Sequence, residues 1–309
     1  MGARPVMKAR VNRFAGGGAA NRTTSDAARH ASYLSDATIS TIKATAPVVA
    51  PRAKDITTAF YRTMFENNPE VLAFFNKNHQ KHGTQPQALA DAVVAYASNI
   101  DNLGALDGAV TKIAHRHCAL SVLPGMYPIV HDNLMLAIAE VLGDAVTPEI
   151  GAAWSNAVNA LAEILIGKEE ELYKVAESRS GGWRLEREFV LTGKRIVGPG
   201  TIRFDFAPID ANSGPDGFEF EAGQYITLRL PGLPDTAPRH YTLTSPPWGR
   251  TLQCTTRAVS GGEMSTYMHG ARFAVGAPLL VGAPFGPSNF ALFVVAELIF
   301  CNESAAYHS

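Results

Sequence analysis

The sequence has few cysteines, no long apolar run and almost no net charge. Its three cysteines, Cys118, Cys254 and Cys301, form no CxxC zinc pattern and no dense disulfide framework, which fits a reducing compartment. No uncharged apolar run reaches the ~18 residues that span a bilayer, which excludes an integral membrane protein. The 27 basic and 28 acidic residues give a net charge of −1. Without a basic field we expect no nucleic-acid partner.

The overall amino-acid composition is that of an ordinary globular protein. The chain has 309 residues, of which 46% are hydrophobic and 18% are charged. This balance is too apolar for a disordered chain. At a prior of ~150 residues per domain, the length predicts about two domains.

Residues 1–33 form a basic extension that we expect to be disordered. Residues 1–32 hold six Lys or Arg residues against a single acid, Asp26, and include the run Gly16-Gly17-Gly18. A basic, acid-poor N-terminus is typical of a mitochondrial transit peptide. The alternatives are an uncleaved flexible extension and a wrongly assigned start codon. We therefore expect a cytoplasmic protein, with mitochondrial targeting as the alternative.

Residues 34–178 predict a domain built of helices only. Ser35 and Thr147 are suited to cap helix N-termini, and Pro148 follows at a first turn, where proline is tolerated. Apolar residues recur at helical spacing through this region. The clearest stripes are Ile56/Phe60/Met64, Leu89/Val93/Tyr96/Ile100, Val110/Ile113, Val130/Leu134/Ala137/Val141 and Trp154/Val158/Leu161/Leu165/Leu172.

Two polar residues stand on these apolar stripes. His117 continues the stripe of Val110, whereas its neighbour His115 does not, and Glu169 continues the inner face of the last helix. A buried histidine is more often a hydrogen-bonded core residue than a ligand, and a buried carboxylate is costly unless it is paired. The presence of both His117 and Glu169 in one helical domain favours a joint role, because a metal-ligating imidazole usually donates its other N–H to a carboxylate or carbonyl. Periodicity alone does not identify the group that is bound.

Several motifs in this region resemble the globin domain of flavohaemoglobins. The similarity runs over residues 34–177. It is carried by FYRTMFENNPE at 60–70, FFN at 74–76, Gln85 with Leu89, AYASNI at 95–100 and IAHRH at 113–117. The resemblance implies an all-α globin fold that binds haem b.

The resemblance also implies roles on the proximal side of the haem. In that family the histidine that matches His117 ligates the iron, and the residues that match Tyr127 and Glu169 hydrogen-bond around it. An imidazole bonded to a carboxylate is a stronger electron donor to iron, which favours O2 activation over reversible storage.

On the distal side, the residues that match Tyr61 and Gln85 contact bound O2 in that family. Phe75 matches the aromatic residue that packs on the haem, and Leu89 matches a residue of the distal pocket. Val158 departs from the pattern, since some relatives have a tyrosine there. Taken without the resemblance, Tyr61 could be a surface tyrosine and Gln85 a residue at a helix start.

Beyond residues 178–182, a plausible hinge, the pattern changes to short alternating segments punctuated by Gly and Pro. This pattern predicts an antiparallel sheet or barrel over residues 183–290. The predicted strands are residues 187–190, 201–206, 224–230, 241–244, 252–259 and 279–281.

Three motifs follow one another in this second region: GQY at 223–225, RHYT at 239–242 and GGEMST at 261–266. An arginine two residues before a tyrosine on a strand can place a guanidinium on a pyrophosphate and a ring against a flavin. A Gly-rich turn that opens a helix suits a second phosphate contact. Taken singly, each motif is also consistent with an ordinary strand or turn.

In this order and spacing the motifs resemble the FAD-binding β-barrel of the ferredoxin-reductase superfamily, the second domain of flavohaemoglobins. PFG at 284–286 fits the end of that barrel. The family reading assigns Arg239, Tyr241 and Thr242 to FAD, Tyr225 to the flavin region, and Ser265 and Thr266 to the phosphates.

Flavohaemoglobins continue with a parallel α/β domain that binds NAD(P)H. We find no Gly-rich nucleotide loop before the last residue, Ser309, and interpret residues 291–309 as a truncated tail. The NAD(P)H site would then be absent, and we expect poor NAD(P)H oxidation by this chain.

The family implies a nitric oxide dioxygenase, which converts NO and O2 to nitrate with electrons that pass from NAD(P)H through FAD. We expect a monomer whose partners are the small molecules O2 and NO. Two alternatives stay open. One is a non-enzymatic O2-binding globin module or inert fragment, and the other is a flavin-only reductase with a decayed globin half.

Overall fold

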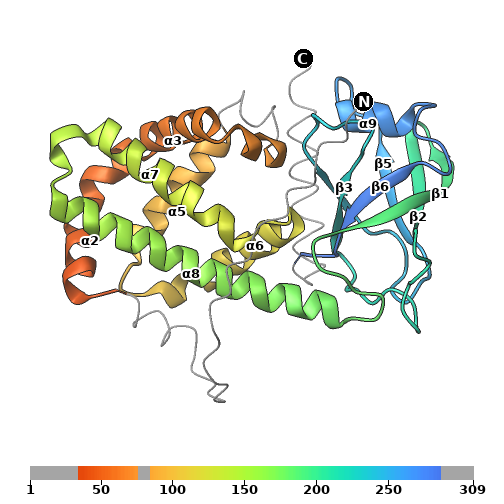
Figure 1. Ribbon diagram of the computed structural model, residues 1–309, viewed down its shortest axis with the longest axis horizontal. Helices are drawn as coiled ribbons and strands as arrows, with labels where there is room; N and C mark the ends of the chain where they lie inside the picture. The colour runs from red at the N-terminus through yellow and green to blue at the C-terminus, as the bar shows by residue number, and fades with distance from the viewer. Residues whose placement is uncertain (1–33, 76–83, 287–309) are drawn as a thin grey trace.

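The computed structural model describes residues 34–75 and 84–286, in which helices come first and a β-sheet second (Figure 1). The predicted basic extension and the predicted tail at 291–309 lie outside the described residues. The α-helices of the first part are α2 (Asp36–Val49), α3 (Ala53–Asn67), α5 (Thr84–Ser98), α6 (Asp107–Ala119), α7 (Tyr127–Leu142) and α8 (Pro148–Ser178). Short 3₁₀ helices connect them: η1 (Ala50–Arg52), η2 (Pro69–Phe74), η3 (Leu103–Leu106), η4 (Pro124–Met126) and η5 (Gly143–Ala145).

Both predicted N-caps are confirmed. The Ser35 hydroxyl accepts a hydrogen bond from the Thr38 N–H at 3.2 Å, so α2 begins where the sequence indicates. The Thr147 hydroxyl accepts from the Ile150 N–H at 3.3 Å, and Pro148 is the first residue of α8. Each cap satisfies one backbone donor that the first turn of a helix leaves open.

The helices pack around a shared apolar core, which confirms the all-helical prediction for this part. Helix α3 packs on α5 and α7, whereas α2 and α6 pack on α8. Ile42, Met64 and Trp154 are fully buried in this core. The buried Tyr96 hydroxyl of α5 donates to the Ala157 carbonyl of α8 at 2.8 Å, so the polar end of its ring is satisfied.

The second part is a six-stranded antiparallel sheet with a short helix, α9 (Glu263–His269), between its last two strands along the chain. Its strand order is β4-β3-β6-β1-β2-β5. The strands are β1 (Glu186–Gly198), β2 (Thr201–Pro208), β3 (Tyr225–Arg229), β4 (Arg239–Thr242), β5 (Leu252–Arg257) and β6 (Pro278–Gly282). The core of the sheet is aromatic, with Phe189, Phe204 and Phe206 fully buried.

The antiparallel prediction is confirmed, but the barrel is not closed. Strands β4 and β5, at the two ends of the strand order, form no continuous ladder in the described residues and are joined just after β4 by an isolated bridge between Leu243 and Cys254. Pro246 and Pro247 follow β4 closely. Because proline has no backbone N–H to donate to a ladder, strand pairing ends there.

Helix α8 joins the two parts. Its 31 residues correspond to about 46 Å at the rise of an α-helix, and it runs from the far side of the helical part to the sheet (Figure 1). The end of α6 also reaches the sheet, since Cys118 and Ala119 are 1% exposed and belong to the core cluster of the sheet. No helix in the described part of the chain is long and apolar enough to cross a membrane.

Candidate functional site

His117 and Glu169, the two polar residues on apolar stripes, meet in the structure. The His117 Nδ1 atom lies 2.7 Å from Oε1 of Glu169. The Tyr127 hydroxyl, at the start of α7, donates a short hydrogen bond to the same carboxylate oxygen and lies 3.2 Å from Nδ1 of His117. Three helices therefore contribute one side chain each to a single polar cluster.

This cluster determines which nitrogen of His117 carries the proton. An ionised carboxylate only accepts hydrogen bonds, so Nδ1 of a neutral His117 must be the donor to Glu169. The remaining ring nitrogen, Nε2, then has its lone pair available. About a third of the His117 side chain, 32%, is exposed, so this atom is accessible. A neutral imidazole with a free Nε2 is the usual form of a metal-ligating histidine.

Glu169 itself is 2% exposed and would be costly to bury alone. The two hydrogen bonds from His117 and Tyr127 offset that cost. Burial, followed by the charge of Glu169, raises the pKa of Tyr127 well above its usual range, so the phenol stays a donor. The same causes raise the pKa of Cys118 to about 12. Cys118 is therefore a thiol and donates weakly to the Glu169 carbonyl at 3.5 Å.

A second group of predicted residues gathers on α3 and η2. The ring of Tyr61 lies 5.8 Å from that of Phe75 in an edge-to-face arrangement, and Phe65 contacts both rings. Tyr61 is 9% exposed, and burial raises the pKa of its hydroxyl to about 12. Within residues 34–75 and 84–286 that hydroxyl has no hydrogen-bond partner.

Helix α5 lies beside this group. The Thr57 hydroxyl, one turn before Tyr61, donates to the Pro86 carbonyl at 2.8 Å, which holds the start of α5 against α3. Gln85 and Leu89 lie one turn apart on α5 and share a face. Leu89 is only partly buried, although it packs on the helical core.

The packing between the two groups is incomplete. Helix α6, which carries His117, packs on α8, and the described residues show no extensive packing of α6 on α3 or α5. Phe75 and Leu89 are apolar yet only partly buried. A partly exposed imidazole with a free Nε2, half-buried apolar side chains and a protonated tyrosine hydroxyl together fit a flat apolar metal complex such as haem.

The residues predicted for the flavin lie on β3, β4 and the first turn of α9. Arg239 and Tyr241 are two apart on β4, at the end of the strand order, so they share one face. The Arg239 guanidinium donates to the carbonyls of Ala237 and Pro238 at 2.8 and 3.1 Å, and its partial burial lowers its pKa. A half-buried cation beside a tyrosine at a sheet edge fits a pyrophosphate next to a ring system.

The other predicted flavin residues are placed differently. Tyr225 pairs with Thr242 across β3 and β4, on the face opposite to Arg239. Ser265 is buried, and its hydroxyl accepts from the Val259 N–H at 3.1 Å, which holds the Gly-rich turn together. Thr266 is exposed at the first turn of α9. The structure thus brings Tyr225 and Thr242 together and keeps the Ser265 hydroxyl within its own turn.

His115 joins the helical part to the sheet. Its Nδ1 accepts the Gly286 N–H at 3.2 Å, and its ring contacts that of Phe285. Gly286 has φ +121°, and a Cβ there would lie 2.9 Å from the Tyr225 ring, so a larger residue would not fit. Phe285 and Tyr225 exchange both backbone hydrogen bonds. The candidate flavin residue Tyr225 is therefore linked to a histidine two residues from His117.

Comparison with known proteins agrees with this layout. The globin family model matches residues 58–165. A flavohaemoprotein of Rhizobium meliloti is 40% identical over 270 residues, which cover 85% of this chain and 66% of that protein. Flavohaemoprotein A of Dictyostelium discoideum is 40% identical over 82% of this chain and 65% of its own length.

A crystal structure of the Malassezia yamatoensis flavohaemoglobin, with bound FAD and haem, superposes with a TM-score of 0.70 at 30% identity over 82% of this chain and 65% of that one. This chain belongs to the flavohaemoglobin family. It spans slightly under two thirds of the length of these relatives. The family assignment made from the motifs is confirmed, and so is the fold of a globin part followed by an antiparallel sheet.

The sequence did not indicate which residues form the contact between the helical part and the sheet. The sequence placed His115 outside the apolar stripe of its helix but gave no indication of where the side chain lies; in the structure it contacts the sheet. Tyr173 and Arg184, which lie at the same junction, were not predicted to matter at all. A tyrosine on the buried row of α8, one turn after Glu169, was the available signal for Tyr173.

The raised pKa of Tyr61 predicts a pH dependence of stability. Between pH 10 and about 12 the unfolded chain loses this phenolic proton while the folded chain keeps it, so stability conferred below pH 10 is lost as the pH rises. We expect the difference in unfolding free energy between wild type and Tyr61→Phe to change by about 2–3 kcal/mol over this interval in favour of the variant. Urea unfolding followed by far-UV circular dichroism at several pH values measures it.

Phe60→Leu is the matched control, because it alters a neighbouring buried ring that has no titratable group. Its effect on stability should be the same at every pH. A Tyr61→Phe difference that is equally flat would show that the hydroxyl is not desolvated.

Proposed function

We propose that this chain binds haem through His117 and acts as a nitric oxide dioxygenase. The observation that carries the proposal is the His117 Nδ1–Glu169 hydrogen bond of 2.7 Å, which leaves Nε2 free for iron and backs it with a buried carboxylate. When bound, haem would supply the iron at which NO, O2 and one electron combine to nitrate. The proton positions on His117 and Tyr127 are fixed by Glu169.

The residues of the chain have separate tasks in this proposal. Glu169 accepts a hydrogen bond from Nδ1 of His117, which increases the electron donation of the ring. Tyr127 keeps the carboxylate oriented. The Tyr61 hydroxyl stays protonated and donates a hydrogen bond that orients O2, with the Gln85 amide as the second donor. Phe75 and Leu89 exclude water from the site.

We further propose that FAD binds at the β4 edge and supplies electrons. Arg239 would hold the pyrophosphate and Tyr241 the flavin from one face of β4, whereas Thr242, paired with Tyr225, would contact the flavin from the other face at this edge. Ser265 would hold the Gly-rich turn in shape, and Thr266 would contact the phosphates. The link from Tyr225 through Phe285 and Gly286 to His115 supports a short distance between the two cofactors. NAD(P)H would be the electron source, as the resemblance implies.

A second candidate function is a non-enzymatic O2-binding module. It would need the same His117 but no electron supply from the sheet. The buried carboxylate behind His117 favours the enzyme, because stronger electron donation promotes O2 activation over storage.

Removal of the proposed iron ligand should abolish haem binding. We expect His117→Ala, reconstituted with hemin, to lose the strong Soret absorbance that wild type shows. His115→Ala is the matched control and should keep the Soret absorbance, because this histidine lies two residues away and its ring contacts the sheet. Full Soret absorbance in His117→Ala would overturn the ligand assignment.

The dioxygenase proposal predicts rapid nitrate formation in a single turnover. Haem-loaded protein, reduced chemically and equilibrated with O2, should convert added NO to an equal amount of nitrate within the mixing time of a stopped-flow instrument. Tyr61→Phe should slow this by about 10²-fold, the typical effect of removing one oriented donor. Slow decay with little nitrate from wild type would favour the O2-binding module.

FAD retention should depend on Arg239. We expect Arg239→Gln to weaken FAD binding by at least tenfold, since a charge-assisted contact to phosphate is lost. Fluorescence titration with FAD measures the change. Arg257→Gln, at the exposed end of β5, should bind FAD like wild type. Equal affinity of wild type and Arg239→Gln would place the FAD pyrophosphate elsewhere.

A further inference from the structure

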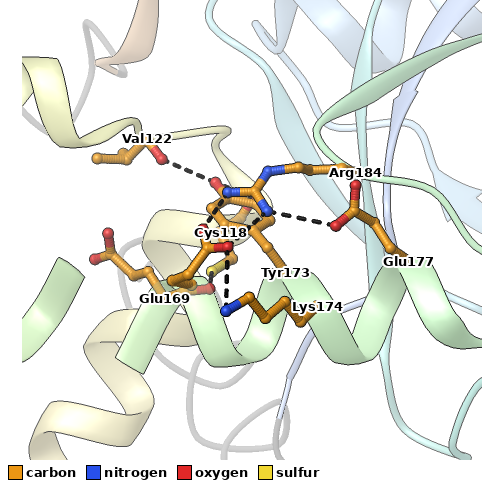
Figure 2. A network of polar contacts seen from close by, with 8 residues as sticks. Cys118, Val122, Glu169, Tyr173, Lys174, Glu177 and Arg184 are labelled. Atoms are coloured by element: carbon orange, nitrogen blue, oxygen red, sulfur yellow. Dashed lines mark hydrogen bonds and ion pairs between the residues drawn. The ribbon is translucent and has the colours of Figure 1, made fainter. Parts of the chain in front are cut away.

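We propose that Tyr173 is a positioning residue, which fixes the distance between His117 and Glu169 and couples it to the contact with the sheet. This inference rests on the proposed haem function. Tyr173 lies one turn after Glu169 on α8 and is 1% exposed. It touches the end of α6, the turn after it and Arg184 in the segment that leads into the sheet (Figure 2). It also touches the last described turn of the sheet.

The first contact of Tyr173 is with the turn that follows the helix of the proposed ligand. Its hydroxyl donates to the Val122 carbonyl at 2.9 Å, and the Val122 N–H donates to the His117 carbonyl at 3.0 Å. Burial raises the pKa of Tyr173 well above its usual range, so this phenol remains a donor. Two consecutive hydrogen bonds thus connect the ring of Tyr173 to the backbone of His117.

The turn after α6 has an unusual backbone. Ser121 has φ +61°, a left-handed conformation that a residue other than glycine rarely adopts. Its buried hydroxyl has no hydrogen-bond partner in the described part of the chain. Backbone hydrogen bonds hold the turn, among them that of the Ser121 N–H to the Cys118 carbonyl at 3.0 Å, but a disfavoured backbone persists only where the surrounding structure also fixes it. The Tyr173 hydroxyl fixes the next carbonyl.

The second contact of Tyr173 is with the segment that leads into the sheet. The Arg184 guanidinium lies 4.5 Å from the centre of the Tyr173 ring. Arg184 also pairs with Glu170 and, at 3.4 Å, with Glu177, on either side of Tyr173 along α8 (Figure 2). A cation held over the ring by two acids restricts the ring to one orientation.

The third contact is with the sheet itself. The rings of Tyr173 and Phe285 lie 5.9 Å apart with an angle of 86°. Phe285 also contacts His115 and pairs with Tyr225. Any shift of the sheet relative to α8 therefore acts on the Tyr173 ring, and through Val122 on the backbone of His117. Glu169, on α8 itself, does not follow that shift, so the His117–Glu169 distance changes.

The test is the iron–histidine stretching band in resonance Raman spectra of the haem-loaded, chemically reduced full chain. The band reports hydrogen bonding at Nδ1 of the ligand. Glu169→Gln serves as the reference for a weakened bond. We expect Tyr173→Phe, which keeps the ring but loses the hydroxyl, to shift the band part of the way from wild type towards Glu169→Gln. Arg184→Gln should shift it in the same direction by less.

Lys174→Gln is the matched control, because Lys174 follows Tyr173, is 70% exposed and only approaches Glu170 at 3.8 Å. Its band should stay at the wild-type position. A Tyr173→Phe band at the wild-type position, even with a lowered melting temperature, would overturn the inference, because the tyrosine then only stabilises the fold. If the wild type shows neither a Soret band nor an iron–histidine band, the proposed function itself is overturned.

Discussion

The hydrogen bond between His117 and Glu169 constrains much of the helical part. A carboxylate that is 2% exposed is tolerated only when donors surround it, and the donors here come from α6 and α7 while the carboxylate comes from α8. Those three helices must therefore meet at one point. Removal of either donor would leave a buried charge with too few partners, so the cluster selects the helix arrangement as well as the tautomer of His117.

Helix α8 extends this constraint to the sheet. Its buried row places Leu165 in the helical part, Glu169 at the polar cluster, and Tyr173 and Ala176 in the core of the sheet. One rigid element thus carries the partner of the proposed iron ligand and the contact with the sheet within about two turns. The position of the sheet and the environment of His117 are consequently not independent of each other.

The predictable features were those that depend on local sequence. Ser35 and Thr147 cap helices through backbone N–H groups three residues away, and His117 and Glu169 stand out because they interrupt apolar stripes. Tyr127 lies on no such stripe and entered only through the resemblance to flavohaemoglobins. The open sheet could not be read from alternation, because alternation shows which face of a strand is buried but not whether the first and last strands of the sheet pair.

The contacts across the junction could not be predicted for a related reason. Helical periodicity identifies the face of α6 that packs within its own domain, so His115, on another face, was read as outside the site. In the structure that face packs on the sheet, and His115 accepts the Gly286 N–H. The residues on either side of Arg116 therefore face two different partners, the proposed iron site and the sheet. Only Arg116 separates these two histidines along α6, so the backbone of one short segment connects the two environments.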